Sequence, residues 1–196
     1  MNYSQNNEDT IITNYFKGRT GVLLDIGAND GYTFSNSLAL IDGGWAAVLV
    51  EPSPTAFKKL SELHGNNANV KLHNVAISTK KGTSTYYDMG NHVDETDTSL
   101  LSTLVADELK RWDGVEFKTS KVKTVPYSAI ENVYDFITID AEGLDYDILK
   151  QIDLEHTQMI CLEWNSNKHT LDLFRAYVPA EMKEILRNAE NVIYAR

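Results

Sequence analysis

A glycine-bounded turn directly after an apolar run is the feature that most restricts the fold of this chain. Residues 21–31 read Gly-Val-Leu-Leu-Asp-Ile-Gly-Ala-Asn-Asp-Gly. The run Val22–Ile26 is typical of a parallel strand buried on both faces. Gly27 and Gly31 carry no Cβ, so the backbone there can adopt a positive φ and approach a ligand closely. Because open α/β sheets bind ligands outside the carboxyl ends of their strands, the turn predicts a site at that edge.

A glutamate at the end of the next predicted strand indicates what this site binds. Glu51 follows the apolar run Ala46–Val50, and its two oxygens can accept hydrogen bonds from both hydroxyls of a ribose. A dinucleotide such as NAD requires Gly-x-Gly-x-x-Gly, but position 29 is Asn29 and the acidic Asp30 would repel a diphosphate. The pattern therefore favours S-adenosylmethionine (SAM), which has no phosphate, over a dinucleotide or an ordinary strand-to-helix connection.

Length and charge exclude several classes of protein. The 196 residues suffice for a single domain with a full core, spanning residues 1–196. A formal net charge of −10 disfavours nucleic acid as the main partner, because nucleic-acid binders usually present a basic face. The N-terminus lacks a basic and apolar leader, and no apolar run is long enough to span a bilayer. We therefore expect a cytoplasmic protein without a membrane span, and nothing in the sequence indicates its oligomeric state.

Strands and helices alternate along most of the chain, which predicts a doubly wound, mostly parallel α/β sheet. One helix would begin at Asn7 as its N-cap, and another at Ser53-Pro54. The remaining expected elements are strands at Val70–Ile77, Tyr134–Ile139 and Gln158–Glu163 and a helix at Asp145–Gln151.

Two regions depart from this alternation. Met182–Leu186 and Asn191–Ala195 flank a turn-like segment and predict a terminal antiparallel hairpin, although Glu181–Asn188 also fits a helix. A long insertion at residues 81–126 contains a predicted strand at Thr83–Tyr87. Segments of this length inside a compact domain are usually disordered or act as substrate-gripping lids, and we favour the lid.

Six motifs occur together and in order, and they carry a family resemblance. They are Ser4-Gln-Asn-Asn-Glu-Asp9, Leu24-Asp-Ile-Gly-Ala-Asn-Asp-Gly31, Glu51-Pro52, Asn74-Val-Ala-Ile-Ser78, Ile139-Asp-Ala-Glu-Gly143 and Leu162-Glu-Trp-Asn165. With these motifs the chain resembles the FkbM family of SAM-dependent methyltransferases over nearly its whole length. The resemblance implies the Rossmann-like class I methyltransferase fold, which has a seven-stranded sheet whose last strand runs antiparallel.

The resemblance also implies a set of cofactor-binding residues. The glycine loop would contact the methionine part and the ribose of SAM, and Glu51 would hold the ribose diol. Val75 and Ala76 would offer apolar contact to the adenine ring, while Ser4 and Gln5 would fold over the cofactor as a polar flap. The full expected set is Ser4, Gln5, Asp25, Gly27, Ala28, Asn29, Gly31, Glu51, Pro52, Asn74, Val75, Ala76 and Asp140.

Three carboxylates are the candidate catalytic residues. Asp140 and Glu142 follow the fourth predicted strand and Glu163 ends the fifth, so a class I strand order brings them together beside the methyl position. A hydroxyl acceptor needs a general base or a metal, and the carboxylates could act as a base and its orienter. Alternatively, Asp140, Glu163 and Asn165 could bind a divalent cation through oxygen.

Histidine is the usual alternative base, but none lies in these motifs. Related metal-dependent sugar methyltransferases carry a histidine soon after the fourth-strand aspartate, where this chain has Ala141, Glu142 and Gly143. This difference favours a metal-free carboxylate base, although His92 in the insertion or His169 after the fifth strand could swing toward the acceptor. The requirement for a divalent cation therefore stays open.

The sequence thus predicts a SAM-dependent O-methyltransferase that yields S-adenosylhomocysteine (SAH). Its acceptor would be a small molecule or glycan, namely a hydroxyl of a sugar, nucleotide-sugar or glycan. Two alternatives remain, a lipid or natural-product hydroxyl and a non-catalytic SAM-binding module. Such a module would assemble on a partner through Trp45, Trp112 or Trp164.

Overall fold

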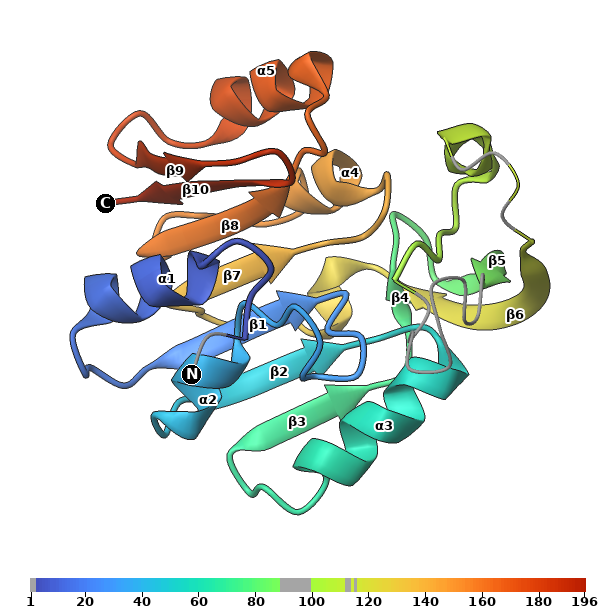
Figure 1. Cartoon of the computed structure of the whole chain (residues 1–196), viewed down its shortest axis with the longest axis horizontal. Helices are drawn as coiled ribbons and strands as arrows, with labels where there is room; N and C mark the ends of the chain where they lie inside the picture. The colour runs from blue at the N-terminus through green and yellow to red at the C-terminus, as the bar shows by residue number, and fades with distance from the viewer. Residues whose placement is uncertain (1–2, 89–99, 112–113, 115) are drawn as a thin grey trace.

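A computed structural model describes residues 3–88, 100–111, 114 and 116–196. Its centre is a seven-stranded sheet, in which every neighbouring pair from β3 to β8 runs parallel and β10 runs antiparallel to both its neighbours (Figure 1). In sheet order the strands are β3 (Val70–His73), β2 (Ala46–Val50), β1 (Val22–Ile26), β7 (Phe136–Ile139), β8 (Met159–Glu163), β10 (Asn191–Ala195) and β9 (Lys183–Arg187).

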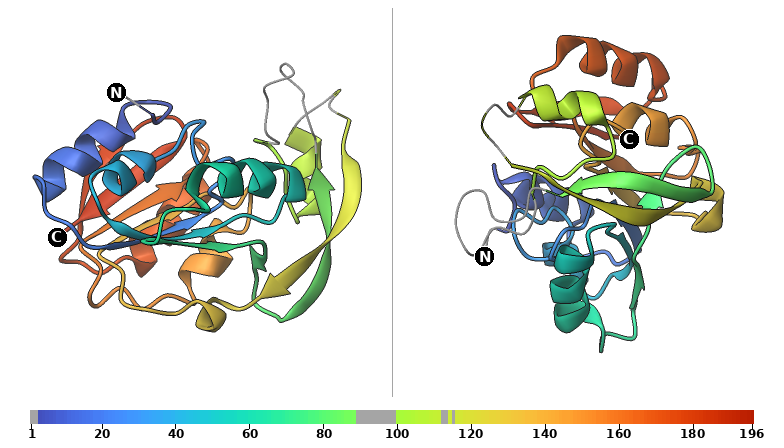
Figure 2. Two further views of the ribbon diagram at one scale, coloured as in Figure 1. Left: turned by 90° about the horizontal axis from the view of Figure 1, so that it is seen from below. Right: turned by 90° about the vertical axis from the view of Figure 1, so that its right-hand side faces the viewer.

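Helices cover both faces of the sheet, because the parallel strands are apolar on both faces. One core cluster joins Leu23 and Leu49 of the sheet to residues of α1 (Glu8–Phe16), α2 (Leu38–Asp42) and α3 (Pro54–His64). A second cluster joins the opposite strand face to three further helices, and Figure 2 shows the two layers edge-on. These helices are α4 (Asp145–Leu149), α5 (Lys168–Tyr177) and the 3₁₀ helix η2 (Tyr127–Ala129).

The predicted strand Val70–Ile77 is wrong as a single element. The chain leaves the main sheet after β3, and Ala76–Ile77 forms β4 of a separate three-stranded sheet with the order β4-β6-β5. The break is at Asn74, whose side-chain amide donates to the carbonyl oxygens of Glu51 (2.8 Å) and Pro52 (3.2 Å). These bonds hold the end of β3 against the end of β2 while the backbone turns away.

The insertion supplies the other two strands of this second sheet. β5 (Gly82–Asp88) pairs antiparallel with β6 (Lys118–Val125), and a 3₁₀ helix, η1 (Ala106–Arg111), lies between them in sequence. Figure 1 shows the second sheet beyond the carboxyl ends of the main strands. The ends of the predicted lid are therefore ordered strands that form a wall beside the expected binding edge.

The terminal hairpin is confirmed, with β9 one residue later than predicted, and the alternative helix at Glu181–Asn188 is wrong. Two of the described α-helices were not predicted, namely α2 and α5. Asn7 is the N-cap residue of α1 as predicted, but its side chain makes no capping hydrogen bond. Ser4 makes one instead, since its Oγ accepts from the backbone N–H of Asp9 at 3.1 Å. Among the described residues no helix is both long and apolar enough to cross a bilayer.

Candidate active site

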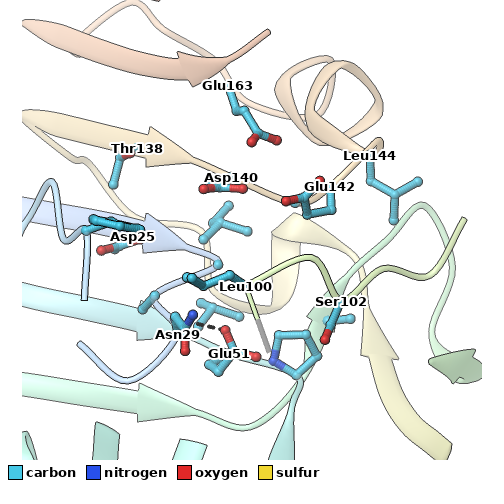
Figure 3. Close-up of a pocket in the computed structure, with 18 of the residues that line it drawn as sticks. Asp25, Asn29, Glu51, Leu100, Ser102, Thr138, Asp140, Glu142, Leu144 and Glu163 are labelled. Carbon is cyan, nitrogen blue, oxygen red and sulfur yellow. Dashed lines mark hydrogen bonds between the residues drawn. The ribbon is translucent and has the colours of Figure 1, made fainter. Parts of the chain in front are cut away.

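A cavity of about 320 Å³ opens at the carboxyl ends of β1, β2, β7 and β8. The predicted turn after β1 and the second sheet form two of its walls, and Figure 3 shows the side chains that face it. Of the residues predicted from sequence, those that line it are Gln5, Asp25, Gly27, Ala28, Asn29, Glu51, Pro52, Val75, Ala76, Asp140, Glu142, Glu163 and Asn165.

Glu51 ends β2 and is 5% exposed. One of its oxygens accepts from the backbone N–H of Asn29 at 2.9 Å, and the other accepts from that of Ser53 at 2.6 Å. Burial raises the pKa of Glu51 to about 8, against the lowering effect of these two hydrogen bonds. The carboxyl group therefore ties the glycine turn to the start of α3 while it faces the cavity.

The predicted glycines have the expected backbone conformation, with φ of 90° at Gly27 and 79° at Gly31. Close approach to a ligand was the reason predicted for these glycines, whereas the structure explains them by contacts within the protein. A Cβ at Gly27 would lie 1.7 Å from the carbonyl oxygen of Asp140, and one at Gly31 would lie 2.6 Å from Leu60 of α3. Gly27 must therefore be glycine for the turn to pack against the backbone that follows β7, whatever the cavity contains, and at Gly31 the positive φ is the main reason for glycine.

Three of the predicted cofactor residues lie outside the cavity lining: Ser4, Gly31 and Asn74. Ser4 is instead part of the N-terminal motif that caps α1, where its Oγ also donates to Asp9 Oδ1 at 2.9 Å. Glu8 in the same motif is fully buried and accepts from Asn188 and Asn191 of the terminal hairpin, at 2.7 and 2.9 Å. This motif thus joins the N-terminal segment to the hairpin and leaves Gln5 at the cavity.

The three candidate catalytic carboxylates meet at the other end of the cavity from Glu51 (Figure 3). One oxygen from each of Asp140, Glu142 and Glu163 lies within 4.8 Å of those of the other two. Their convergence was predicted from the strand order. Glu142 has a positive φ of 44°, and this turn directs it back to the cluster formed by the two strand ends.

Burial and mutual repulsion raise the pKa of all three carboxyl groups. Asp140 keeps contact with solvent through the cavity, but the protein around it removes most of its hydration. This desolvation and the neighbouring Asp145 raise the pKa of Asp140 to about 7. The pKa values of Glu142 and Glu163 are raised well above the usual range for the same reasons, and a side-chain hydrogen bond joins Glu163 to Asp140. Asn165, the other proposed metal ligand, donates to Glu163.

The insertion contributes a wall that the sequence did not reveal. Leu100, Leu101, Ser102 and Leu104 line the cavity together with Tyr86 of β5. The hydroxyl of Thr103 donates to the carbonyl oxygen of Glu142 at 2.6 Å, so this segment is fastened to the loop that carries the cluster. Further lining residues not predicted are Thr33, Phe34, Ser35, Asn36, Leu144, Glu190 and Asn191.

The remaining candidates have other positions. His169 is exposed at the start of α5 and does not line the cavity, while His92 and Trp112 lie outside the described residues. Trp45 is 2% exposed and packs in the core, so it is not available to bind a partner. Trp164 is partly buried and donates its Nε1–H to the carbonyl oxygen of Asn188.

Comparison with protein families gives a match that covers most of the chain. The methyltransferase FkbM domain matches residues 25–192. The chain belongs to the FkbM methyltransferase family. This match confirms the family predicted from the six motifs. Among curated proteins, no sequence matches this FkbM methyltransferase.

Solved structures confirm the class I SAM-dependent methyltransferase fold. The yhhF protein of Escherichia coli aligns with a TM-score of 0.52 at 12% identity, covering 98% of this chain and 87% of that one. A precorrin-6y methyltransferase from Geobacter metallireducens GS-15 gives 0.52 at 10% identity, with 96% and 87% covered. A ribosomal protein methylase from Lactobacillus delbrueckii subsp. bulgaricus gives 0.50 at 12% identity, with 96% and 76% covered. Identities this low show the fold alone.

SAM is the cofactor that this family and fold imply, and the cavity has suitable chemistry for it. Six carboxylate residues line the cavity, and the described lining contains no lysine, arginine or histidine. SAM carries positive charge on its sulfonium and ammonium groups, so this lining attracts it and would repel a diphosphate. The buried Asn29 Oδ1 also has no hydrogen-bond partner among the described residues, which leaves it available to a ligand.

Proposed function

We propose that this methyltransferase transfers a methyl group from SAM to a hydroxyl of a sugar, nucleotide-sugar or glycan. The observation that carries the proposal is the cluster of Asp140, Glu142 and Glu163 at the cavity end opposite Glu51. With the ribose at Glu51, the reacting end of the cofactor would extend toward this cluster. Polar lining residues such as Thr33, Ser102 and Asn165 suit an acceptor rich in hydroxyls.

The chain offers specific groups to hold the cofactor. Glu51 would accept from the ribose hydroxyls, Val75 and Ala76 would contact the adenine, and Asp25 and Gln5 would lie along the methionine part. When bound, SAM supplies an electrophilic methyl group on a positively charged sulfur. The walls of the cavity would hold the acceptor oxygen in line with that methyl group, since alignment itself contributes much of the acceleration in such displacements.

A carboxylate of the cluster would accept the proton of the acceptor hydroxyl. Transfer forms an oxygen–carbon bond, breaks the carbon–sulfur bond with its electron pair going to sulfur, and releases one proton from the hydroxyl. Asp140 is a suitable base because burial raises its pKa to about 7, near the pH at which a general base is most effective. Burial also raises the pKa of Glu142 above its usual value. Asn165 would orient Glu163 through its hydrogen bond.

The charge of the cavity supports an acceptor that is uncharged near its reacting hydroxyl. Six carboxylates would repel a nearby phosphate, so the diphosphate of a nucleotide-sugar must extend away from the cluster. The same repulsion and the net charge of −10 support our prediction that the acceptor is not a nucleic acid. We also keep the prediction of a cytoplasmic reaction on a small molecule or glycan.

An acceptor screen tests the proposal. SAH release is measured from purified protein and SAM with neutral glycosides, nucleotide-sugars, lipid alcohols and a short RNA as acceptors. We expect release with a sugar hydroxyl and formation of a methyl ether, identified by mass spectrometry. Release only with the lipid alcohols or the RNA would reject the acceptor class, and SAM binding without release on any member would favour a non-catalytic module.

A further inference from the structure

The carboxylate cluster is more crowded than a general base and its orienter require. Asp140, Glu142 and Glu163 come from two neighbouring strand ends, and one oxygen of each lies within 4.8 Å of the other two. Figure 3 shows the three carboxyl groups turned toward a common space. Like charges at such distances repel strongly in a partly buried site. The arrangement therefore calls for positive charge between them.

A second observation concerns Glu142 alone. Its side chain is buried, with 8% of the residue exposed, and its Oε2 has no hydrogen-bond partner among the described residues. Most buried polar atoms in proteins have a partner, and one without a partner is destabilising unless a ligand satisfies it. The other carboxylates face Glu142 where a donor would be expected. An oxygen left in this way offers a lone pair to a cation.

The protein supplies little positive charge of its own at this place. The described cavity lining contains no lysine, arginine or histidine. Arg111 of η1 is close enough to interact electrostatically with Glu142 and Glu163, but its guanidinium also forms an ion pair with Glu108 at 2.6 Å. One arginine shared with Glu108 does not balance three carboxylates.

We propose that Asp140, Glu142 and Glu163 bind one divalent cation, Mg²⁺ or Mn²⁺. An oxygen-only set of donors suits these hard cations, whereas zinc and copper prefer nitrogen or sulfur ligands. The donor set differs from the one considered from sequence, because Glu142 joins it and Asn165 instead orients Glu163 by a hydrogen bond.

The cation would also take part in the proposed methyl transfer. This catalytic role rests on the proposed function. A metal-bound hydroxyl loses its proton more readily than a free one, and the proton would pass to a carboxylate oxygen of the cluster that does not bind the cation. The cation would also occupy the space between the carboxylates, so the acceptor oxygen would be held by the metal at the end of the cavity where we place the methyl transfer. The binding of the cation itself depends only on the three side chains and does not require the acceptor to be known.

A titration with manganese alone tests the site. Chelator-treated protein is titrated with Mn²⁺, and free Mn²⁺ is followed by electron paramagnetic resonance. We expect one Mn²⁺ per chain, displaced by excess Mg²⁺. Glu142→Gln and Glu163→Gln should each weaken binding by at least about tenfold, the lower end of the loss when support of a metal site is removed. Glu190→Gln is the matched control, because Glu190 lines the same cavity outside the cluster and should keep the wild-type affinity.

Each outcome decides the question. A wild-type protein that binds no Mn²⁺ at millimolar concentration, or a Glu190→Gln variant that loses as much affinity as Glu142→Gln, overturns the proposal. Circular dichroism and SAH binding show that each variant is folded. Methyl transfer at full rate in chelator would overturn the cation and leave the proposed function intact. Stoichiometric Mn²⁺ binding that depends on Glu142, together with no sugar methylation in the screen, would support the cation and reject the proposed acceptor.

Discussion

The two ends of the cavity use their polar groups in different ways. At one end both oxygens of Glu51 accept backbone N–H groups, and the Asn74 amide donates to two carbonyl oxygens. At the other end Asp140, Glu142 and Glu163 face one another, and Glu142 Oε2 has no partner among the described residues. At the first end the groups around Glu51 satisfy one another and only Asn29 Oδ1 lacks a partner among the described residues, whereas the second end has uncompensated charge. Folding alone can thus account for the chemistry of the first end but not for that of the second.

The largest effect is expected at the uncompensated end. Glu142→Gln removes one of three crowded carboxylates whose charge Arg111 offsets only in part, so the fold should survive while turnover falls by roughly 10²–10⁴-fold, the usual contribution of a positioned base. SAH formation with a sugar acceptor and calorimetric SAM binding measure the two effects separately. Glu155→Gln, an exposed residue remote from the cavity, is the control. A Glu142→Gln protein with normal turnover would remove Glu142 from the chemistry.

Gly27→Val, at the Glu51 end of the cavity, should instead destabilise the fold. The new side chain would collide with the Asp140 carbonyl and would require a positive φ, so strain and overpacking together should cost about 4 kcal/mol of unfolding free energy. Urea unfolding followed by circular dichroism measures the loss. If the variant keeps wild-type stability and loses only SAM binding, Gly27 is required by the ligand. The fold would then not explain this residue of the Glu51 end.

A smaller and combined loss is expected at Glu51. Glu51→Ala leaves the N–H groups of Asn29 and Ser53 without their acceptors, each at a cost of about 1–3 kcal/mol, and should lower SAM affinity at least about tenfold. Glu51→Gln keeps one acceptor oxygen, so it should lose less stability and less SAM affinity than Glu51→Ala. Calorimetry and urea unfolding on the pair test whether binding and stability fall together here. Unchanged affinity in Glu51→Ala would show that Glu51 does not hold the cofactor.

The mildest test is the dependence of stability on pH. Burial raises the pKa of Asp25 to about 6 and that of Glu51 to about 8, and burial together with the neighbouring Asp145 raises that of Asp140 to about 7. In the unfolded chain such groups titrate near about pH 4, so the folded protein binds more protons between these values. The unfolding free energy should therefore fall as pH rises from about 5 to about 8, and the Asp140→Asn variant should show a shallower fall. Urea midpoints that rise over this window would contradict the raised pKa values.

The parts of the fold that were predictable share one physical property. β1 and β2 have the predicted bounds, because burial on both faces leaves an apolar run that ends where the chain reaches the sheet edge. The Val70–Ile77 prediction failed because its break depends on Asn74 donating to residues 51 and 52, a contact between segments that no local pattern shows. α5 was missed because only Leu171 and Phe174 are buried along its ten residues.

In the site, as in the fold, the positions set by strand order were predictable and those set by contacts between distant segments were not. Strand ends meet at one edge of a parallel sheet, so the convergence of Asp140 and Glu163 follows from topology alone. The position of Glu142 depends on a positive φ and on Thr103, which belongs to an insertion whose path the sequence did not indicate. The structural reason for Gly27 also required knowledge of which carbonyl lies opposite it.

The Glu8 contacts have a consequence for the order in which the protein is made. Glu8 binds Asn188 and Asn191, which follow it by 180 and 183 residues, and Gln5 and Asn191 both line the cavity. Domains generally fold as units during synthesis, and contacts this distant wait for the later partner. A ribosome must therefore have released the terminal hairpin before the cavity has all its walls. The cofactor therefore meets its complete site only after Asn188 and Asn191 have emerged from the ribosome.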